Sequence, residues 1–100
     1  MLDIATALDR VRETTTLDAR SVSTSWAGLR TFAPDRVVVL GPDPLEPSFA
    51  WCAGQGGFGI QSCPAAARSI VSLVDRGVLP DDVAALGGDA AAVRPDRFRA

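Results

Sequence analysis

Histidine, tyrosine, lysine and asparagine are all absent from this sequence of 100 residues. Without histidine or lysine, the chain cannot supply an imidazole base, an imidazole metal ligand, a Schiff-base amine or a P-loop lysine. These absences make a phosphate-binding loop protein a weak hypothesis. Chemistry at this chain has to use carboxylates, arginine, thiols, hydroxyls, backbone dipoles or a cofactor that brings its own reactivity.

Cysteine and long apolar runs are scarce as well. The two cysteines, Cys52 and Cys63, fit neither a C-x-x-C nor a zinc-site spacing. We expect no metal site, and two small buried residues in a reducing compartment. No signal peptide and no bilayer-spanning run is evident, so we expect a cytoplasmic protein with no membrane partner.

Charge of one sign is not in excess, because the formal net charge is −2. This balance gives no electrostatic reason to expect nucleic acid as a partner. The arginines are scattered, apart from Arg94, Arg97 and Arg99 near the C-terminus. We interpret that cluster as part of an irregular, solvated tail.

Hydrophobic patterns predict an α+β chain with an N-terminal helix, about three strands and one long helix. The first helix would be capped by Asp3 and would carry Ile4, Leu8 and Val11 on one stripe. The strands would cover residues 17–26, 36–40 and 49–53, the last two buried and separated by a proline-rich loop.

The long helix is expected to follow a glycine-rich turn, with Pro64 in its first turn and Gly77 as its stop. Its apolar stripe comprises Ala66, Ala67, Ile70, Val71, Leu73 and Val74. Its polar face comprises Arg68, Ser69, Ser72, Asp75 and Arg76. A short helix over residues 80–86 and one more turn capped by Asp89 complete the expected elements.

The glycine-rich turn is the most informative motif, because four of the six residues 54–59 are glycine. Its backbone can approach a flat ligand closely, and the helix that follows presents unpaired N–H groups and partial positive charge. Such a turn suits a phosphate, a carboxylate or an electron-accepting ring. A tight turn without a ligand is the alternative.

The expected elements are too few for a complete domain. About three strands and one long helix cannot cover both faces of a sheet, and strands made of apolar runs need cover on both sides. The sequence therefore indicates a piece of a larger α/β or α+β enzyme.

Two segments together resemble a known family. Residues 26–35 (WAGLRTFAPD) with 38–42 (VVLGP), and residues 53–61 (AGQGGFGIQ) with Pro64-Ala65, resemble the C-terminal part of the FAD-dependent D-amino acid oxidase family. The likeness is strongest to glycine oxidase-like members and runs from about Leu17 to Val78. It implies an oxidoreductase in which FAD accepts hydride from an amino acid or a secondary amine.

The resemblance also implies roles for individual residues. Backbone N–H groups of the turn would face the pyrimidine edge of the flavin, whose negative charge in the reduced form suits a helix N-terminus. The residues so implied are Gly54, Gln55, Gly56, Gly57, Phe58, Gly59, Ile60 and Gln61. Arg30 would pair with the substrate carboxylate, which its planar fork can bind through two hydrogen bonds. No residue is assigned as a catalytic base.

Several of these residues have alternative interpretations. Arg30 could instead pair with a carboxylate of the protein. Trp26 fits a core or sheet surface better than a substrate wall. Gln55 either donates to the flavin or points to solvent, and Phe58 either covers a cofactor face or packs.

The sequence also departs from the family pattern. Gly57 stands where some relatives have a second arginine, and residues 26–32 lack the cysteine that attaches flavin covalently in sarcosine oxidase-like members. We therefore expect non-covalent FAD.

The N-terminal Rossmann half that binds the ADP part of FAD is expected to be absent. We interpret Gly54, Gly56, Gly57 and Gly59 as having the wrong spacing and neighbours for its G-x-G-x-x-G fingerprint, and no acidic residue follows about twenty positions later in a strand. Residues 1–100 would then be a single C-terminal segment, inactive alone and dependent on the missing half as partner. The alternative is a non-catalytic fold remnant or interaction subunit that does not bind flavin alone.

Overall fold

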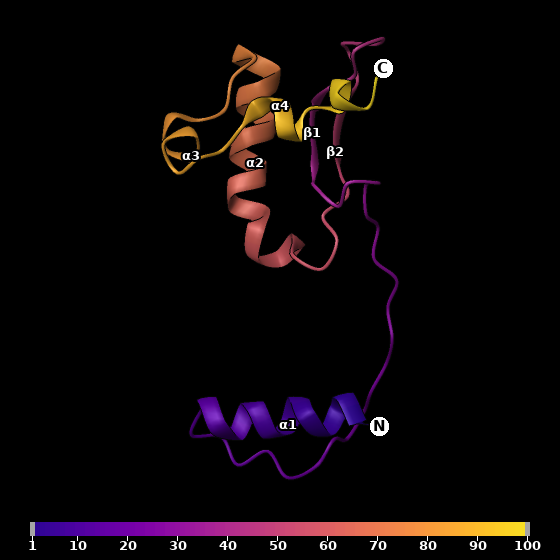
Figure 1. Cartoon of the computed structure of the whole chain (residues 1–100), viewed down its shortest axis with the longest axis vertical. Coiled ribbons are helices and arrows are strands. Elements are labelled where there is room, and N and C mark those ends of the chain that lie inside the picture. Colours follow the sequence, from indigo (N-terminus) through magenta and orange to yellow (C-terminus); the bar gives the residue numbers. More distant parts are fainter. Residues whose placement is uncertain (1, 100) are drawn as a thin grey trace.

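The computed structural model describes residues 2–99 and contains a detached helix and a small α+β unit (Figure 1). Its elements are α1 (Leu2–Thr14), β1 (Val39–Pro42), β2 (Ala50–Ala53), α2 (Gly59–Arg76), α3 (Asp81–Ala85), α4 (Ala90–Val93) and the 3-10 helix η1 (Pro95–Phe98). The predicted α+β class is confirmed, with two strands in this range instead of about three. No helix within residues 2–99 is long and apolar enough to cross a membrane.

Helix α1 lies apart from the other elements, at the opposite end of a molecule 51 Å long (Figure 1). No residue from 2 to 32 is buried, and Trp26 is 86% exposed, so its predicted place in a core or on a sheet is wrong. The predicted strand over residues 17–26 is also wrong, because no strand lies beside this segment to accept its backbone hydrogen bonds. The helix begins at Leu2, so Asp3 stands inside the first turn and is not its cap.

Strands β1 and β2 form an antiparallel pair in which Leu40 lies opposite Cys52 and Gly41 opposite Trp51. Asp43 organises their connection, because its carboxylate accepts hydrogen bonds from Trp51 Nε1 at 2.9 Å and from the Leu45 N–H at 2.8 Å. The first strand, predicted to be buried over residues 36–40, runs from Val39 to Pro42 instead; of the predicted range Leu40 is buried, whereas Arg36 and Val37 are exposed. The prediction that the second strand is buried is wrong, since three of the four residues of β2 are exposed.

Helix α2 packs on one face of this strand pair (Figure 1). The core consists of Leu40, Ala66, Leu73 and Leu79. Part of the predicted polar face is buried instead, namely Ser69 and Ser72. The Ser72 hydroxyl donates to the carbonyl of Val78 at 2.6 Å, which satisfies it inside the fold. The predicted core residues Ala67, Val71 and Val74 are exposed instead.

Helix α2 ends where the sequence predicts, but its beginning differs from the prediction. The helix begins at Gly59, so Pro64 lies inside it and not in its first turn. The Cys63 thiol donates to the Ile60 carbonyl at 3.1 Å, an acceptor that Pro64 has no N–H to reach. Gly77 ends the helix as predicted, with φ 73° and its N–H bonded to the carbonyl of Leu73.

Both cysteines are free and exposed, so the prediction that they are buried is wrong. Cys52 lies in the open strand β2, and Cys63 lies on the outer side of α2.

The C-terminal segment is ordered and contacts β1. Asp89 caps α4 as predicted, accepting a hydrogen bond from the Ala91 N–H at 2.8 Å. The prediction of an irregular tail after Arg94 is wrong, because the 3-10 helix η1 forms there. The solvated interpretation is also wrong for Arg97, whose side chain is only 12% exposed.

Candidate functional site

The glycine turn joins β2 to α2 and needs glycine at two positions. Gly54 has φ 71° and Gly56 has φ 57°, a region that other residues enter only with strain. A Cβ on Gly56 would lie 2.5 Å from the Phe32 ring, and one on Gly54 would lie 3.3 Å from the Ala33 backbone nitrogen. The turn is therefore closed on the side that meets residues 31–33.

The opposite side of the turn is open at Gly57. A Cβ added there would meet no atom within 4 Å, and its φ is one that any residue can adopt. Nothing in the fold of residues 2–99 requires glycine at this position. The backbone at Gly57 is therefore accessible to a ligand from outside the chain.

One hydrogen bond connects the two motifs that carry the family resemblance. The N–H of Gly56 donates to the carbonyl of Thr31 at 3.0 Å. Thr31 directly follows Arg30, so the glycine turn is fixed beside the backbone that carries this arginine. The structure thus places the glycine turn next to the segment that carries Arg30, as a shared site would require.

The N-terminus of α2 is not capped by a side chain. Phe58 occupies the N-cap position with φ −109° and makes no side-chain capping hydrogen bond. The first N–H groups of a helix have no acceptor within it, so those of Gly59, Ile60 and Gln61 are directed out of its end. Phe58 and Ile60 are 64% and 95% exposed, so Phe58 does not serve as packing here.

Gln55 has a defined position between β2 and α2. Its Nε2 donates to the Cys52 sulfur at 3.6 Å, and its Oε1 accepts from the Ser62 hydroxyl at 3.4 Å. The side chain is half-buried, so it does not simply point to solvent. A donor role toward flavin stays a prediction.

Arg30 lies in the exposed segment before the turn. Its Nη1 donates to the carbonyl of the neighbouring Leu29 at 3.1 Å. Of the ion pairs formed among residues 2–99, none involves Arg30, so the alternative pairing with a protein carboxylate is not observed. Its guanidinium remains open to a carboxylate from outside.

An apolar cleft of about 430 Å³ lies next to the turn. It is lined by Thr31, Phe32, Gly54 and Trp51, and on the tail side by Phe98 and Arg99. Of the predicted site residues only Gly54 lines it, whereas Arg30 and residues 55–61 lie outside this cleft. Neither Phe32 nor the C-terminal tail was identified from the sequence as a neighbour of the turn. Phe32 belongs to the first motif and could have been considered, whereas no local sequence pattern indicates that the tail lies near the turn.

The interpretation that these glycines have the wrong spacing is itself wrong, because Gly54, Gly56 and Gly59 fit the dinucleotide-binding pattern G-x-G-x-x-G and join a strand to a helix. The surroundings differ from that fold, because β2 runs antiparallel to β1 and α2 leads into α3. No parallel βαβ unit forms within residues 2–99. These glycines therefore do not supply the Rossmann half.

Comparison with known families agrees with the motifs. The family model described as FAD dependent oxidoreductase matches residues 2–73, which include Arg30, the glycine turn and most of α2. No solved structure matches the chain. Since the match covers well over half of the sequence, the chain belongs to the family of FAD dependent oxidoreductases.

Proposed function

We propose that this chain provides the flavin-facing turn and the substrate arginine of an enzyme that oxidises an amino acid or a secondary amine. Residues 54–61 would lie against the pyrimidine edge of FAD, and Arg30 would bind the substrate carboxylate. The observation that carries the proposal is the Gly56 to Thr31 hydrogen bond, which joins the two motifs.

The turn fits an electron-rich ring edge. Gly57 leaves its backbone open, and the N–H groups at the start of α2 have no side-chain cap. Partial positive charge at a helix N-terminus stabilises negative charge that develops on a bound group. These features support residues 54–61 as the flavin contact.

Each part of the chain would have a limited task in the reaction. FAD, when bound, supplies the hydride acceptor. Arg30 would hold the substrate carboxylate through two hydrogen bonds and so orient the amine-bearing carbon. The N–H groups of Gly59, Ile60 and Gln61 would stabilise charge at the flavin edge. No cysteine occurs in residues 26–32, which supports non-covalent binding.

We further propose that the ADP part of FAD is held by a nucleotide-binding half outside these residues. The exposed faces support this dependence, since residues 2–32 bury no side chain and Val71 and Val74 of α2 are 67% and 54% exposed. A complete unit of this size would bury more of its apolar surface.

Flavin absorbance tests the proposal. The chain is purified alone, and again together with a nucleotide-binding half encoded upstream of it or supplied separately. We expect bound flavin in the assembled protein and little in the chain alone. An assembled, folded protein without flavin would favour the non-catalytic alternative.

A further inference from the structure

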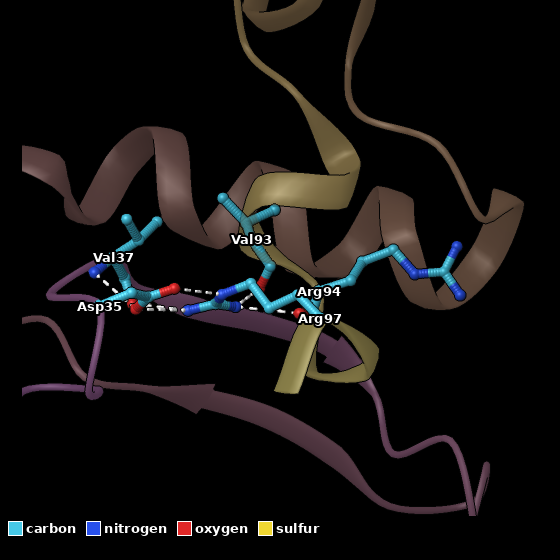
Figure 2. A network of polar contacts seen from close by, with 5 residues as sticks. All are labelled: Asp35, Val37, Val93, Arg94 and Arg97. Carbon is cyan, nitrogen blue, oxygen red and sulfur yellow. Dashed lines mark hydrogen bonds and ion pairs between the residues drawn. The ribbon is translucent and has the colours of Figure 1, made fainter. Parts of the chain in front are cut away.

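Arg97 in η1 uses its whole guanidinium within the chain. Its Nε and Nη2 donate to the two carboxylate oxygens of Asp35 at 2.7 and 3.2 Å, and Nη2 also donates to the Val37 carbonyl at 2.8 Å. Its Nη1 donates to the carbonyls of Val93 and Arg94 at 2.8 and 2.9 Å. Figure 2 shows the guanidinium between Asp35 and Val37 on one side and Val93 and Arg94 on the other. All five N–H donors of the guanidinium are therefore satisfied, and the bonds to Asp35 join residues that are 62 positions apart.

The two residues held by Arg97 flank a strained position. Arg36, between Asp35 and Val37, has φ 63° and is the one non-glycine residue of positive φ within residues 2–99. The left-handed region is unfavourable for a long side chain and persists only where neighbouring contacts impose it. The Asp35 carboxylate also accepts from the Val37 N–H at 3.0 Å, so both sides of Arg36 are fixed to one carboxylate and one guanidinium.

The strained turn is in contact with the glycine turn. The Arg36 guanidinium lies over the Phe32 ring, 5.4 Å from its centroid. The Phe32 ring in turn fills the space beside Gly56, and Thr31 accepts the Gly56 N–H. A continuous series of contacts thus runs from the C-terminal tail to the backbone that we assign to the flavin.

We propose that Arg97 is a positioning residue for the glycine turn: by fixing the turn at Asp35–Val37 it places Phe32 and Thr31 against Gly56. Its relevance to flavin rests on the proposed function, but the positioning itself does not require flavin. The tail that carries Arg97 lies outside residues 2–73, so the family match does not assign it this role. The 2.7 Å bond from its Nε to Asp35 and the low exposure of Arg97 make it a fixed support and not a mobile surface charge.

Amide hydrogen exchange on the full chain without flavin tests the proposal. Arg97→Gln removes the charge and most of the donors, and we expect the Gly56 amide to exchange at least about tenfold faster. The Leu73 amide, in the core-facing part of α2, reports whether the whole unit has loosened. We expect the Leu73 rate to change much less than the Gly56 rate.

Matched variants separate positioning from general damage. Arg94→Gln removes a half-buried tail arginine that pairs with Asp96 at 3.4 Å, and should leave both amides at their original rates. Arg97→Lys keeps the charge but not the planar fork, so its Gly56 rate should fall between those of the wild type and Arg97→Gln. The proposal is overturned if Arg97→Gln changes the Gly56 and Leu73 rates by the same factor, whether that factor is close to one or large. Because no flavin is present, this outcome is separate from any failure to bind FAD.

Discussion

Gly56 and Thr31 are joined by a 3.0 Å hydrogen bond from the glycine N–H to the threonine carbonyl. The bond fixes the turn before α2 to the segment that carries Arg30, although the two are far apart in the sequence. It leaves one side of the turn closed by Phe32 and the other open at Gly57. Gly56 and Gly57 therefore lie in different environments, and substitutions at the two positions should have different effects.

Gly57→Ala should weaken flavin binding without affecting the fold. The added methyl meets no atom of the chain within 4 Å, so the unfolding midpoint should stay unchanged. In the assembled oxidoreductase the methyl would stand between backbone and flavin, and we expect Kd for FAD to rise at least about tenfold. Fluorescence titration with FAD measures this, and an unchanged Kd would show that the flavin does not lie against Gly57.

Gly56→Ala should instead destabilise the chain itself. The methyl would overlap the Phe32 ring at 2.5 Å, and φ 57° is unfavourable for alanine. We expect a loss of about 1–3 kcal/mol in the free energy of unfolding, measured by denaturant titration. Phe32→Ala in the same chain removes the overlap, so the double variant should lose less than the sum of the two single losses.

The contrast between these glycines shows what the sequence could and could not predict. The cluster of glycines, the helix after it and the stop at Gly77 all have local signals, and the structure contains them. Which glycine faces Phe32 and which faces outward depends on the contact with residues 31–33, which no local pattern records.

Other differences from the sequence-based expectations have similar physical causes. Residues 17–26 have a strand-like composition, but no strand lies beside them within residues 2–99. The sequence pattern assigns Ser69 and Ser72 to the polar face of α2, but both are buried. For Ser72 the chain that follows the helix supplies the hydrogen-bond acceptor, the carbonyl of Val78. Arg97 looked like part of a solvated cluster, whereas its partner Asp35 is 62 residues away.

Arg30→Ala should affect substrate binding and not stability. Arg30 is exposed and makes no ion pair among residues 2–99, so the unfolding free energy should change little. In the assembled oxidoreductase, KM for amino-acid substrates should rise at least about tenfold through loss of a charged hydrogen bond. Arg20→Ala removes another exposed arginine and serves as the control. Equal KM values for both variants would make Arg30 a surface residue only.

The Asp35 contacts predict a dependence of stability on acid pH. Hydrogen bonds from Arg97, followed by that from the Val37 N–H, hold the pKa of Asp35 below its ordinary value of 3.8 despite partial burial. Because the folded-state pKa is lowered, this contribution is complete above the unfolded pKa and is lost as pH falls through the folded one.

Asp35→Asn should remove that part of the pH dependence. Unfolding free energies measured at about pH 5 and about pH 3 should differ less in this variant than in the wild type. Asp96→Asn removes a carboxylate from the same tail and controls for the change in net charge. A pH dependence that Asp35→Asn leaves intact would contradict the assignment of the Arg97 contact.

Backbone amide NMR of the assembled oxidoreductase tests the central claim most directly. On addition of FAD, the largest chemical-shift changes in this chain should occur at Gly57, Gly59, Ile60 and Gln61, where the open turn meets the uncapped end of α2. The amides of α4 and η1, on the tail side of β1, should shift far less. FAD that binds while the amides of residues 57–61 remain unshifted would contradict the assignment of this turn to the flavin.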